Sequence, residues 1–204
     1  MMNDKGLLIV LSGPSGAGKD TVINKLIEKD RNIRLSISAT TRKPREGEIN
    51  GQHYHFISKA EFIQLISIDG LLEHAEYCEN YYGTPSEQVY NWLDRGKDVI
   101  LEIEVKGGSQ IRNKCPESVS IFILPPSISV LGERLKSRGT ESQEVIDKRM
   151  FAAVEEISQA VNYDYIVIND SLDECVDNII NIIKSEKMKS IRNVKLIKEV
   201  LENA

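Results

Sequence analysis

The chain carries a glycine-rich segment, Gly-Pro-Ser-Gly-Ala-Gly-Lys-Asp-Thr at residues 13–21, directly after the apolar run Leu7–Leu11. A strand that leads into a glycine-rich turn, a lysine and a helix is the setting of a phosphate-binding P-loop. Glycines let the backbone turn tightly and point successive N–H groups at one anion, and the helix adds its positive N-terminal end. We therefore expect a nucleoside triphosphate to bind here, through Gly13, Ser15, Gly16, Ala17, Gly18, Lys19, Asp20 and Thr21.

One position of this segment departs from the usual pattern. A serine or threonine usually follows the lysine of a P-loop, but here Asp20 follows Lys19 and the hydroxyl comes only at Thr21. An anion in the first turn suits the helix dipole, although it lies near the negative charge of a bound triphosphate. We expect Thr21 to supply the missing hydroxyl, and Asp20 to point outward or to hold a metal-bound water.

The composition is typical of a globular protein with a single hydrophobic core. With 204 residues, 41% of them hydrophobic, the chain can bury a full core in one domain. A net charge of −5 argues against a general nucleic-acid surface. No apolar run approaches the ~20 residues of a membrane span, and the first six residues lack the features of a signal peptide. Three widely spaced cysteines suggest a reducing compartment, so we expect a cytoplasmic protein without membrane or nucleic-acid partners.

Apolar runs alternate with amphipathic stretches along the chain. The runs at 7–11, 98–103, 119–124 and 165–168 are nearly continuous, as in strands that are buried on both faces of a parallel sheet. Helical patterns lie at 19–29, 86–95, 107–114, 128–137 and 142–161. This alternation predicts an α/β protein with the P-loop NTPase fold, in which helices flank a parallel central sheet.

The stretch from residue 36 to residue 86 breaks the alternation. Short alternating runs at 53–57 and 72–77, with a helical pattern at 59–66, predict a small antiparallel sheet with one helix. We therefore divide the chain into a core (1–35 and 87–204) and an inserted unit (36–86) that we expect to hold a second substrate. The tail 187–204 has a helical apolar stripe, and we expect an extra helix that folds back on the domain or contacts a second copy.

Two further segments carry charged side chains at informative spacings. Arg42 and Arg45 lie three residues apart, and arginine forks suit phosphate oxygens; spacing alone leaves a phosphate pocket and a solvated basic loop equally open. Glu102 and Glu104 are two residues apart, so on a strand they would share one face, at the carboxyl end where ligands gather.

Together these segments resemble the guanylate kinase family, whose members transfer the γ-phosphoryl group of ATP to GMP. The resemblance extends from residue 7 to about residue 183. It rests on the P-loop, Thr-Thr-Arg-Lys-Pro-Arg at 40–45, Asn-Tyr-Tyr-Gly-Thr at 80–84, Glu-Ile-Glu at 102–104, Arg134, Arg138-Gly-Thr, Arg149 and Ile-Asn-Asp at 168–170. A P-loop alone indicates only a superfamily, but its combination with the segments at 40–45 and 80–84 is highly specific.

The resemblance implies which residues bind GMP. Its phosphate would be held by Ser38, Arg42, Arg45, Tyr54 and Tyr82. The guanine base would be recognised by Glu73, which can accept hydrogen bonds from N1–H and N2–H together, and by Thr84, which can donate to O6. Adenine has an acceptor at N1 and would leave Glu73 facing a lone pair, so the pair can discriminate strongly.

The resemblance also implies how the phosphoryl group is transferred. Residues around it would be Lys19 and the arginines Arg134, Arg138 and Arg149 of a helical lid within the core (about 126–160), and Asn169 would lie near the adenine of ATP. Glu102 and Glu104 stand where the family usually has Asp-x-Asp; we expect Glu104 to contact GMP and Glu102 to contact a magnesium-bound water, with Thr21 as the other metal-side residue. Mg²⁺ is the expected cofactor, and no general base is needed because a GMP phosphate oxygen is already ionised.

Two other functions fit the same scaffold. A sugar-phosphate kinase such as a ribose-bisphosphate kinase has no use for Glu73 and Thr84, which argues against it. A phosphopeptide-binding scaffold module without catalysis usually has a damaged P-loop and lid, whereas the lysine, the glycines and the arginines are intact here. We therefore expect an enzyme of purine nucleotide metabolism that binds ATP and GMP or dGMP, as a monomer or a homodimer.

Overall fold

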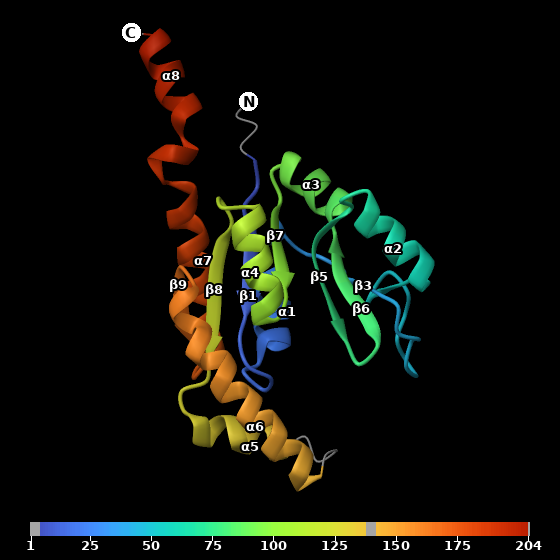
Figure 1. Ribbon diagram of the computed structural model, residues 1–204. Coiled ribbons are helices and arrows are strands. Elements are labelled where there is room, and N and C mark those ends of the chain that lie inside the picture. The colour runs from blue at the N-terminus through green and yellow to red at the C-terminus, as the bar shows by residue number, and fades with distance from the viewer. Residues whose placement is uncertain (1–4, 138–141, 204) are drawn as a thin grey trace.

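The computed structural model describes residues 5–137 and 142–203, and its core is a five-stranded parallel sheet (Figure 1). From one edge to the other, the strands are β2 (Ile33–Leu35), β7 (Asp98–Glu102), β1 (Leu8–Ser12), β8 (Val119–Leu124) and β9 (Tyr165–Ile168). Every neighbouring pair is parallel. The predicted α/β class is confirmed, and β1 is buried along its whole length, as its continuous apolar run indicates.

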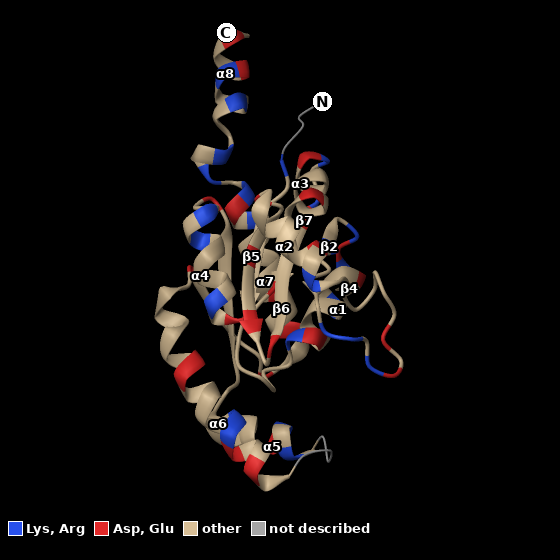
Figure 2. Ribbon diagram, turned by 45° about the vertical axis from the view of Figure 1, so that its right-hand side comes forward, with Lys and Arg blue, Asp and Glu red and all other residues tan. Residues whose placement is uncertain are grey.

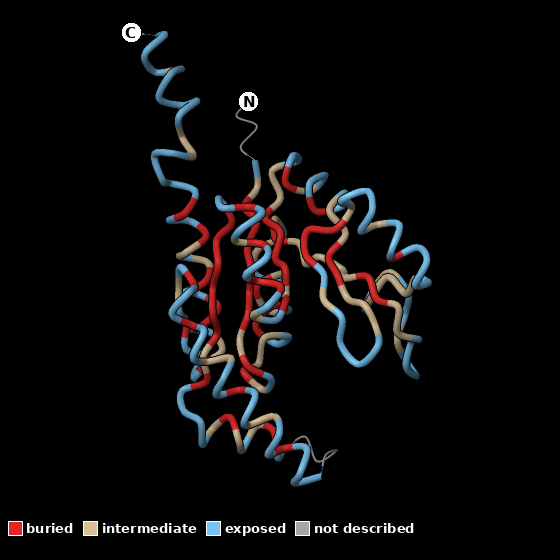
Figure 3. The backbone as a smooth tube through the Cα atoms, viewed as in Figure 1, coloured by how far each residue is buried: buried red, intermediate tan, exposed pale blue. Residues whose placement is uncertain are grey.

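Helices cover both faces of this sheet because successive residues of each strand point to opposite sides. On one face, Ile9 and Leu11 pack with α1 (Lys19–Lys29) and α7 (Leu172–Lys187). On the other face, Leu8 and Val10 pack with α3 (Ser86–Asp94) and α4 (Val105–Lys114). Figure 3 shows the buried strands enclosed by these helices. Among the described residues, no helix combines the length and the apolar character needed to cross a membrane.

A second, smaller sheet lies beside the core (Figure 1). Its strands are, in order, β4 (His55–Phe56), β3 (Ala39–Thr40), β6 (Asn80–Pro85) and β5 (Leu71–Tyr77). Helix α2 (Lys59–Ser67) covers it, with the side chain of Phe62 fully buried. The prediction of an antiparallel sheet is wrong for one pair, since β3 and β4 run parallel. The loop between them carries the chain back to the end of the sheet where β3 begins.

Two lid helices extend past the carboxyl ends of the core strands, α5 (Ile128–Ser137) and α6 (Gln143–Ser158) (Figure 1). They pack on each other through a small apolar cluster of Leu131, Leu135, Ile146 and Ala153. The helix predicted at 142–161 ends at Ser158 and continues as a 3-10 turn, η1 (Gln159–Asn162). Arg138, which the resemblance places in the lid, lies outside the described residues.

The end of the chain does not fold back on the domain, and that expectation is wrong. After α7, a 3-10 turn η2 (Ser190–Arg192) leads into α8 (Val194–Glu202), which extends away from the body beside the N-terminus (Figure 1). No residue of α8 is buried (Figure 3). The turn fixes this direction because Arg192 donates hydrogen bonds to the carbonyl of Glu117 (2.8 Å) and to the carboxylate of Glu186 (3.3 Å).

A buried carboxylate joins the start of the core sheet to the end of α7. The side chain of Asp98, at the first position of β7, is 0% exposed. It accepts hydrogen bonds from the backbone N–H of Leu7 (2.9 Å) and from Nζ of Lys187 (2.6 Å). A buried charge is tolerated only when it is paired in this way.

We expect Asp98→Ala to lower the free energy of unfolding by about 2–4 kcal/mol, because it leaves the buried Leu7 N–H and the Lys187 ammonium without an acceptor. Urea denaturation measures the loss. The control is Asp94→Ala, since Asp94 is exposed and 3.9 Å from Lys5; a change below ~0.5 kcal/mol is expected there. Equal losses in the two variants would contradict a structural role for the buried pair.

Candidate active site

The P-loop forms the turn between β1 and α1, and its geometry demands glycine. Gly16 and Gly18 have φ of 91° and 88°, where side chains are strained. A Cβ on Gly18 would lie 2.6 Å from Nδ2 of Asn169. That amide donates to the carbonyl of Ala17 (2.7 Å), and the ammonium of Lys19 folds back over the loop to the carbonyl of Gly13 (2.9 Å).

Two carboxylates meet beside Lys19. Asp20, exposed on the first turn of α1, lies within hydrogen-bonding reach of the half-buried side chain of Glu102 at the end of β7, and the bond forms when one of the two carboxyl groups is protonated. Burial, followed by the charge of Asp20, raises the pKa of Glu102 to about 7, although the charge of Lys19 opposes the shift. Asp20 therefore faces the site and not the solvent alone, while Thr21 is exposed on the same helical turn.

Glu102 and Glu104 do not share a strand face, so that expectation is wrong. Strand β7 ends at Glu102, and Glu104 is the exposed residue that precedes α4. Ile103, between them, is buried, and its carbonyl accepts a hydrogen bond from the hydroxyl of Ser12 (2.7 Å). The charge of Glu104 instead helps to raise the pKa of Glu73, on the small sheet, where burial is the main cause.

A buried hydrogen-bonded pair joins β5 and β6. The hydroxyl of Thr84 donates to Oε1 of Glu73 (2.7 Å), and both side chains are buried. Because this hydroxyl has only one proton, Thr84 cannot donate to a ligand while this bond is made. On the other side, a Cβ at Gly107 of α4 would lie 2.7 Å from Oε2 of Glu73. Glu73 is therefore fixed between the small sheet and a helix of the core.

An arginine patch lies on the same sheet. The guanidinium group of Arg42 forms a two-bond pair with Glu48 (2.9 and 2.8 Å) and lies 5.5 Å from the ring centre of Tyr54. It also forms a side-chain hydrogen bond with Tyr82, whose ring lies 6.1 Å from that of Tyr54. The Arg42 pair, followed by the backbone N–H of Arg45, lowers the pKa of Glu48 to about 2. Glu48 thus keeps Arg42 beside the two tyrosines.

The other two residues assigned to the phosphate of GMP lie at the border of this patch. Ser38 is half-buried just before β3, and its carbonyl accepts a hydrogen bond from the backbone N–H of His55 (2.9 Å). Arg45 is exposed in the loop after β3, where its backbone N–H donates to Glu48 (2.6 Å).

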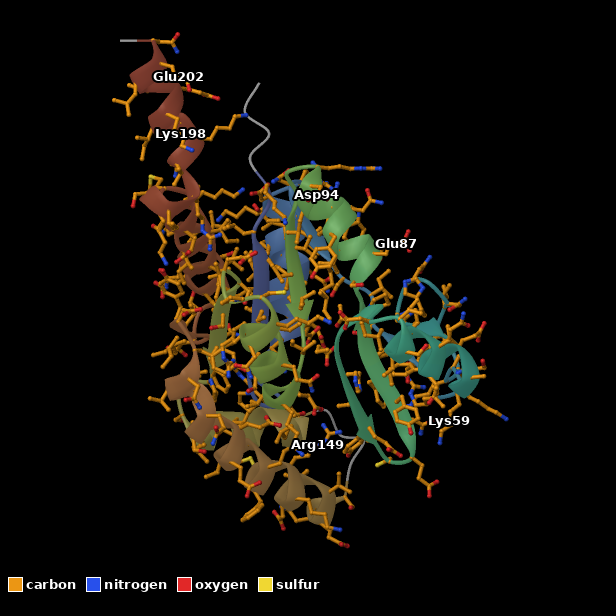
Figure 4. The ribbon with its side chains drawn as sticks, turned by 45° about the horizontal axis from the view of Figure 1, so that its top comes forward. Lys59, Glu87, Asp94, Arg149, Lys198 and Glu202 are labelled. Atoms are coloured by element: carbon orange, nitrogen blue, oxygen red, sulfur yellow. The ribbon has the colours of Figure 1, made fainter. Side chains whose placement is uncertain are left out.

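The lid contacts the P-loop through both of its helices. On α5, Arg134 donates from Nη2 to the carbonyl of Asn169 (2.9 Å), while its buried Nη1 has no hydrogen-bond partner among the described residues. On α6, Arg149 donates to the hydroxyl of Ser15 (3.3 Å), and Figure 4 labels it on this helix. Glu156, also on α6, accepts from the backbone N–H of Ser15, and burial raises its pKa, helped by the charge of Glu104.

Comparison with known proteins decides the family. A sequence model described as guanylate kinase matches residues 5–186, nearly the whole chain. The chain belongs to the guanylate kinase family. It is 49% identical over 201 residues to the guanylate kinase of Latilactobacillus sakei subsp. sakei (strain 23K), covering 98% of this chain and 99% of that one. It is 50% identical over 200 residues to the guanylate kinase of Caldanaerobacter subterraneus subsp. tengcongensis, covering 98% and 97% of the two chains.

A solved structure supports the fold of this guanylate kinase family member. The crystal structure of guanylate kinase from Anaplasma phagocytophilum aligns with a TM-score of 0.78 at 38% sequence identity. The alignment covers 98% of this chain and 95% of that chain. The prediction of a P-loop NTPase fold is thereby confirmed.

Sequence reasoning did not predict three residues that contact the site in this guanylate kinase family member: Glu48, Gly107 and Glu156. Glu48 lies six residues after Arg42, across Pro44, and a turn there could have suggested the pair. Gly107, in the first turn of a helix, where glycine is unfavourable, could have suggested a close approach of another group. Glu156 lies on a long amphipathic helix, and no local signal distinguishes it from a solvated glutamate.

We expect the carboxyl group of Glu102 to titrate near pH 7 in the nucleotide-free and metal-free protein, because burial and Asp20 both disfavour its charged form. Side-chain ¹³C NMR measures the titration, and Glu102→Gln assigns the signal. Asp20→Asn should lower this pKa by removing the neighbouring negative charge.

The matched control is Glu28→Gln, a carboxylate lost from the far end of the same helix, which should leave the titration of Glu102 unchanged. Titration of Glu102 near pH 4 in the unaltered protein, or an equal shift in both variants, would contradict the carboxylate contact.

Proposed function

We propose that this protein transfers the γ-phosphoryl group of ATP to GMP, giving ADP and GDP, in purine nucleotide metabolism. Membership of the guanylate kinase family supports the reaction. The observation that carries the choice of acceptor is the buried pair of Glu73 and Thr84. A buried carboxylate needs donors from its ligand, and guanine presents two adjacent N–H groups.

In this proposal Glu73 accepts N1–H and N2–H of guanine, and Thr84 acts by holding the carboxylate in place. Burial raises the pKa of Glu73, and two donors from guanine would favour its ionised form again. Adenine supplies a lone pair at N1 and no N2 amine, so the carboxylate would lose both bonds. The site is thus built to reject adenine through groups that would be left unpaired.

The phosphate of GMP would bind the arginine patch. Arg42 is already held by Glu48 against Tyr54, so little side-chain freedom is lost when a phosphate replaces water. Tyr82 has a hydroxyl beside the same guanidinium group. Ser38, half-buried just before β3, and Arg45, exposed in the loop after it, complete the set of donors. We assign Glu104, between the small sheet and the lid, to the acceptor nucleotide as well.

Phosphoryl transfer needs positioning and charge stabilisation but no general base. An oxygen of the GMP phosphate attacks the γ-phosphorus, and the bond to the β–γ bridging oxygen breaks to release ADP. Backbone N–H groups of the P-loop and Lys19 would hold the β- and γ-phosphates. Arg134, Arg138 and Arg149 would neutralise the charge that spreads over the transferring group.

Asn169, which we assign to the adenine side of ATP, would act there mainly by holding the P-loop. Its side-chain amide already donates to the carbonyl of Ala17, and its own carbonyl accepts from Arg134. Both contacts fix the turn that receives the triphosphate.

The donors beside Lys19 fit a hard cation. Glu102 and Asp20 supply carboxylate oxygens and Thr21 a hydroxyl, and oxygen ligands, often through water, are what Mg²⁺ prefers. When bound, Mg²⁺ would neutralise charge on the β- and γ-phosphates. The two carboxylates would orient its water ligands, and a cation there would also relieve their mutual repulsion. In this assignment, Asp20 contributes to the magnesium site at the position where a P-loop usually has a serine or threonine.

We further propose that the work is divided between the parts of the chain. Residues 36–86 would form the GMP-binding unit, residues 126–160 the lid, and the remaining core the ATP-binding unit. The protein would act in the cytoplasm, with ATP and GMP or dGMP as its ligands and without nucleic-acid or membrane partners.

The first test measures ADP formation from ATP and Mg²⁺ with GMP, dGMP, AMP, CMP and UMP as acceptors. We expect turnover with GMP, and with dGMP because no assigned residue is reserved for the ribose 2′-hydroxyl. Without an acceptor, ATP hydrolysis should be slow, since the phosphoryl group lacks a positioned nucleophile. Comparable turnover with AMP would contradict the proposal, and tight GMP binding without turnover would favour the scaffold module.

A second test addresses the guanine pair. Glu73→Gln should lower kcat/KM for GMP roughly 100-fold, because it replaces a charged acceptor and turns an amide donor toward N1–H. Thr84→Val should raise KM about 10-fold with a smaller effect on kcat, because Glu73 loses its buried donor. Glu76→Gln, an exposed carboxylate on the same strand, is the control. Equal effects at positions 73 and 76 would overturn the assignment.

A further inference from the structure

Strand β5, which carries Glu73, lies at the edge of the small sheet. An edge strand presents a row of backbone N–H and C=O groups that no neighbouring strand pairs. Here Leu71 and His74 form hydrogen bonds with side chains of α4 through such groups. That helix lies alongside β5 (Figure 1 and Figure 2). Side chains of α4 therefore take the place of a further strand on both sides of Glu73.

The side-chain amide of Gln110 pairs with one residue of this edge at two points. Its Oε1 accepts a hydrogen bond from the backbone N–H of His74 (3.2 Å), and its Nε2 donates to the carbonyl of the same residue (2.9 Å). A residue of a neighbouring antiparallel strand would exchange the same two hydrogen bonds. Because one end of the amide only accepts and the other only donates, both bonds are made in a single orientation. Gln110 therefore holds the backbone of His74 in one position against α4.

Three residues along one face of α4 contact β5. Gly107, Gln110 and Lys114 are spaced at i, i+3 and i+7, which places them in one row along the helix. Nζ of Lys114 donates to the carbonyl of Leu71 (2.9 Å), and Gly107 leaves room for Oε2 of Glu73. This face of the helix thus contacts the strand before, at and after Glu73.

The ladder between β5 and β6 is irregular where Glu73 lies. Between the paired residues Leu71 and His74, β5 has two residues where β6 has only Thr84. Such a bulge leaves one residue without a ladder partner and changes the direction of a side chain. Because pairing with β6 is interrupted at Glu73, the contacts on the other edge of β5 have more influence on how its backbone is held.

We propose that Gln110 is a positioning residue for recognition of the acceptor base, because it holds the backbone of His74 so that the bulge directs the carboxylate of Glu73 at the purine. This inference rests on the proposed function, in which Glu73 accepts two N–H groups of guanine. Two parallel hydrogen bonds require the plane of a carboxylate to be fixed, whereas a carboxylate that can rotate still accepts one. Loss of Gln110 therefore weakens recognition of the N2 amine more than recognition of N1–H.

The variant Gln110→Met keeps the length of the side chain and removes both hydrogen bonds. Gln110 and His74 are exposed, so water can replace these bonds at little cost in stability. We expect the thermal unfolding midpoint to change by less than ~3 °C. Hydrogen exchange at the backbone N–H of His74 should become faster, because this group loses its acceptor.

Equilibrium binding and turnover of GMP and of inosine monophosphate (IMP), whose base lacks the N2 amine, test the inference. Gln110→Met should weaken GMP binding about 10-fold and IMP binding about 2-fold, so that the preference for GMP falls about 5-fold. KM for ATP and kcat at saturating GMP should stay within about 2-fold. The control is Asn113→Leu, which removes an exposed amide from the same helix and should leave the preference unchanged. An unchanged preference in Gln110→Met, or an equal change in the control, would overturn the inference.

A double variant tests whether Gln110 acts through Glu73. Glu73→Gln should remove most of the preference for GMP over IMP, and adding Gln110→Met should then change the preference by less than about 2-fold. A further loss as large as that in the otherwise unaltered chain would show that Gln110 acts by another route and would overturn the inference.

The same measurements separate this inference from the proposed function. Preferential binding of GMP without its phosphorylation would reject the proposed reaction, and the binding ratio would still decide the role of Gln110. Phosphorylation of GMP together with an unchanged preference in Gln110→Met would reject the role of Gln110 alone. Equal binding of GMP and IMP by the unaltered chain would overturn both this inference and the assignment of Glu73.

Discussion

Asn169 forms hydrogen bonds with three separate parts of the molecule, and the site depends on that junction. Its backbone N–H donates to the carbonyl of Leu124 at the end of β8, and its side-chain amide donates to Ala17 in the P-loop. Its carbonyl accepts from Arg134 of the lid. The glycines of the P-loop carry no side chains that could hold its backbone in shape. Its shape is therefore set by partners from the last strand and the lid, which come from the other end of the chain.

Near that junction, several carboxylate side chains lie close enough to repel one another. Asp20 contacts Glu102, and Glu104 acts on both Glu73 and Glu156 through its charge. Burial and repulsion make this arrangement unfavourable in the free protein. In the proposed function, a bound cation and the N–H donors of a nucleotide base would relieve both costs, so part of the affinity for ligands would come from repulsion that exists before they bind.

The sequence predicts the core better than the site, for a physical reason. Buried parallel strands such as β8 read as continuous apolar runs, and α1 and α5 have a clear helical period, so their bounds could be predicted to the residue. Strands β2 and β3 have only three and two residues, which is too short for any periodic signal. Resemblance to a family, rather than pattern, supplied most candidate site residues.

What the sequence could not predict are contacts between distant elements. Strand β7 ends before Glu104, and the carbonyl of Ile103 just before it accepts a hydrogen bond from Ser12, 91 positions away. The proton of Thr84 is committed to Glu73, and Gly107 makes room for that carboxylate from another helix. The course of α8 depends on hydrogen bonds made by Arg192. The spacing of residues within a short segment indicates none of these contacts.

Strand β7 has a further consequence. Its first residue, Asp98, is bound to the helix that leads to α8, and its last residue, Glu102, belongs to the candidate site. In an extended strand these two residues lie about 13 Å apart, and the strand between them is buried and hydrogen-bonded on both edges. Because this strand is rigid, we expect a structural change at one of its ends not to displace the residues at the other end. Mutations could therefore remodel the outer surface near α8 over evolutionary time while leaving the chemistry at the opposite edge of the sheet unchanged.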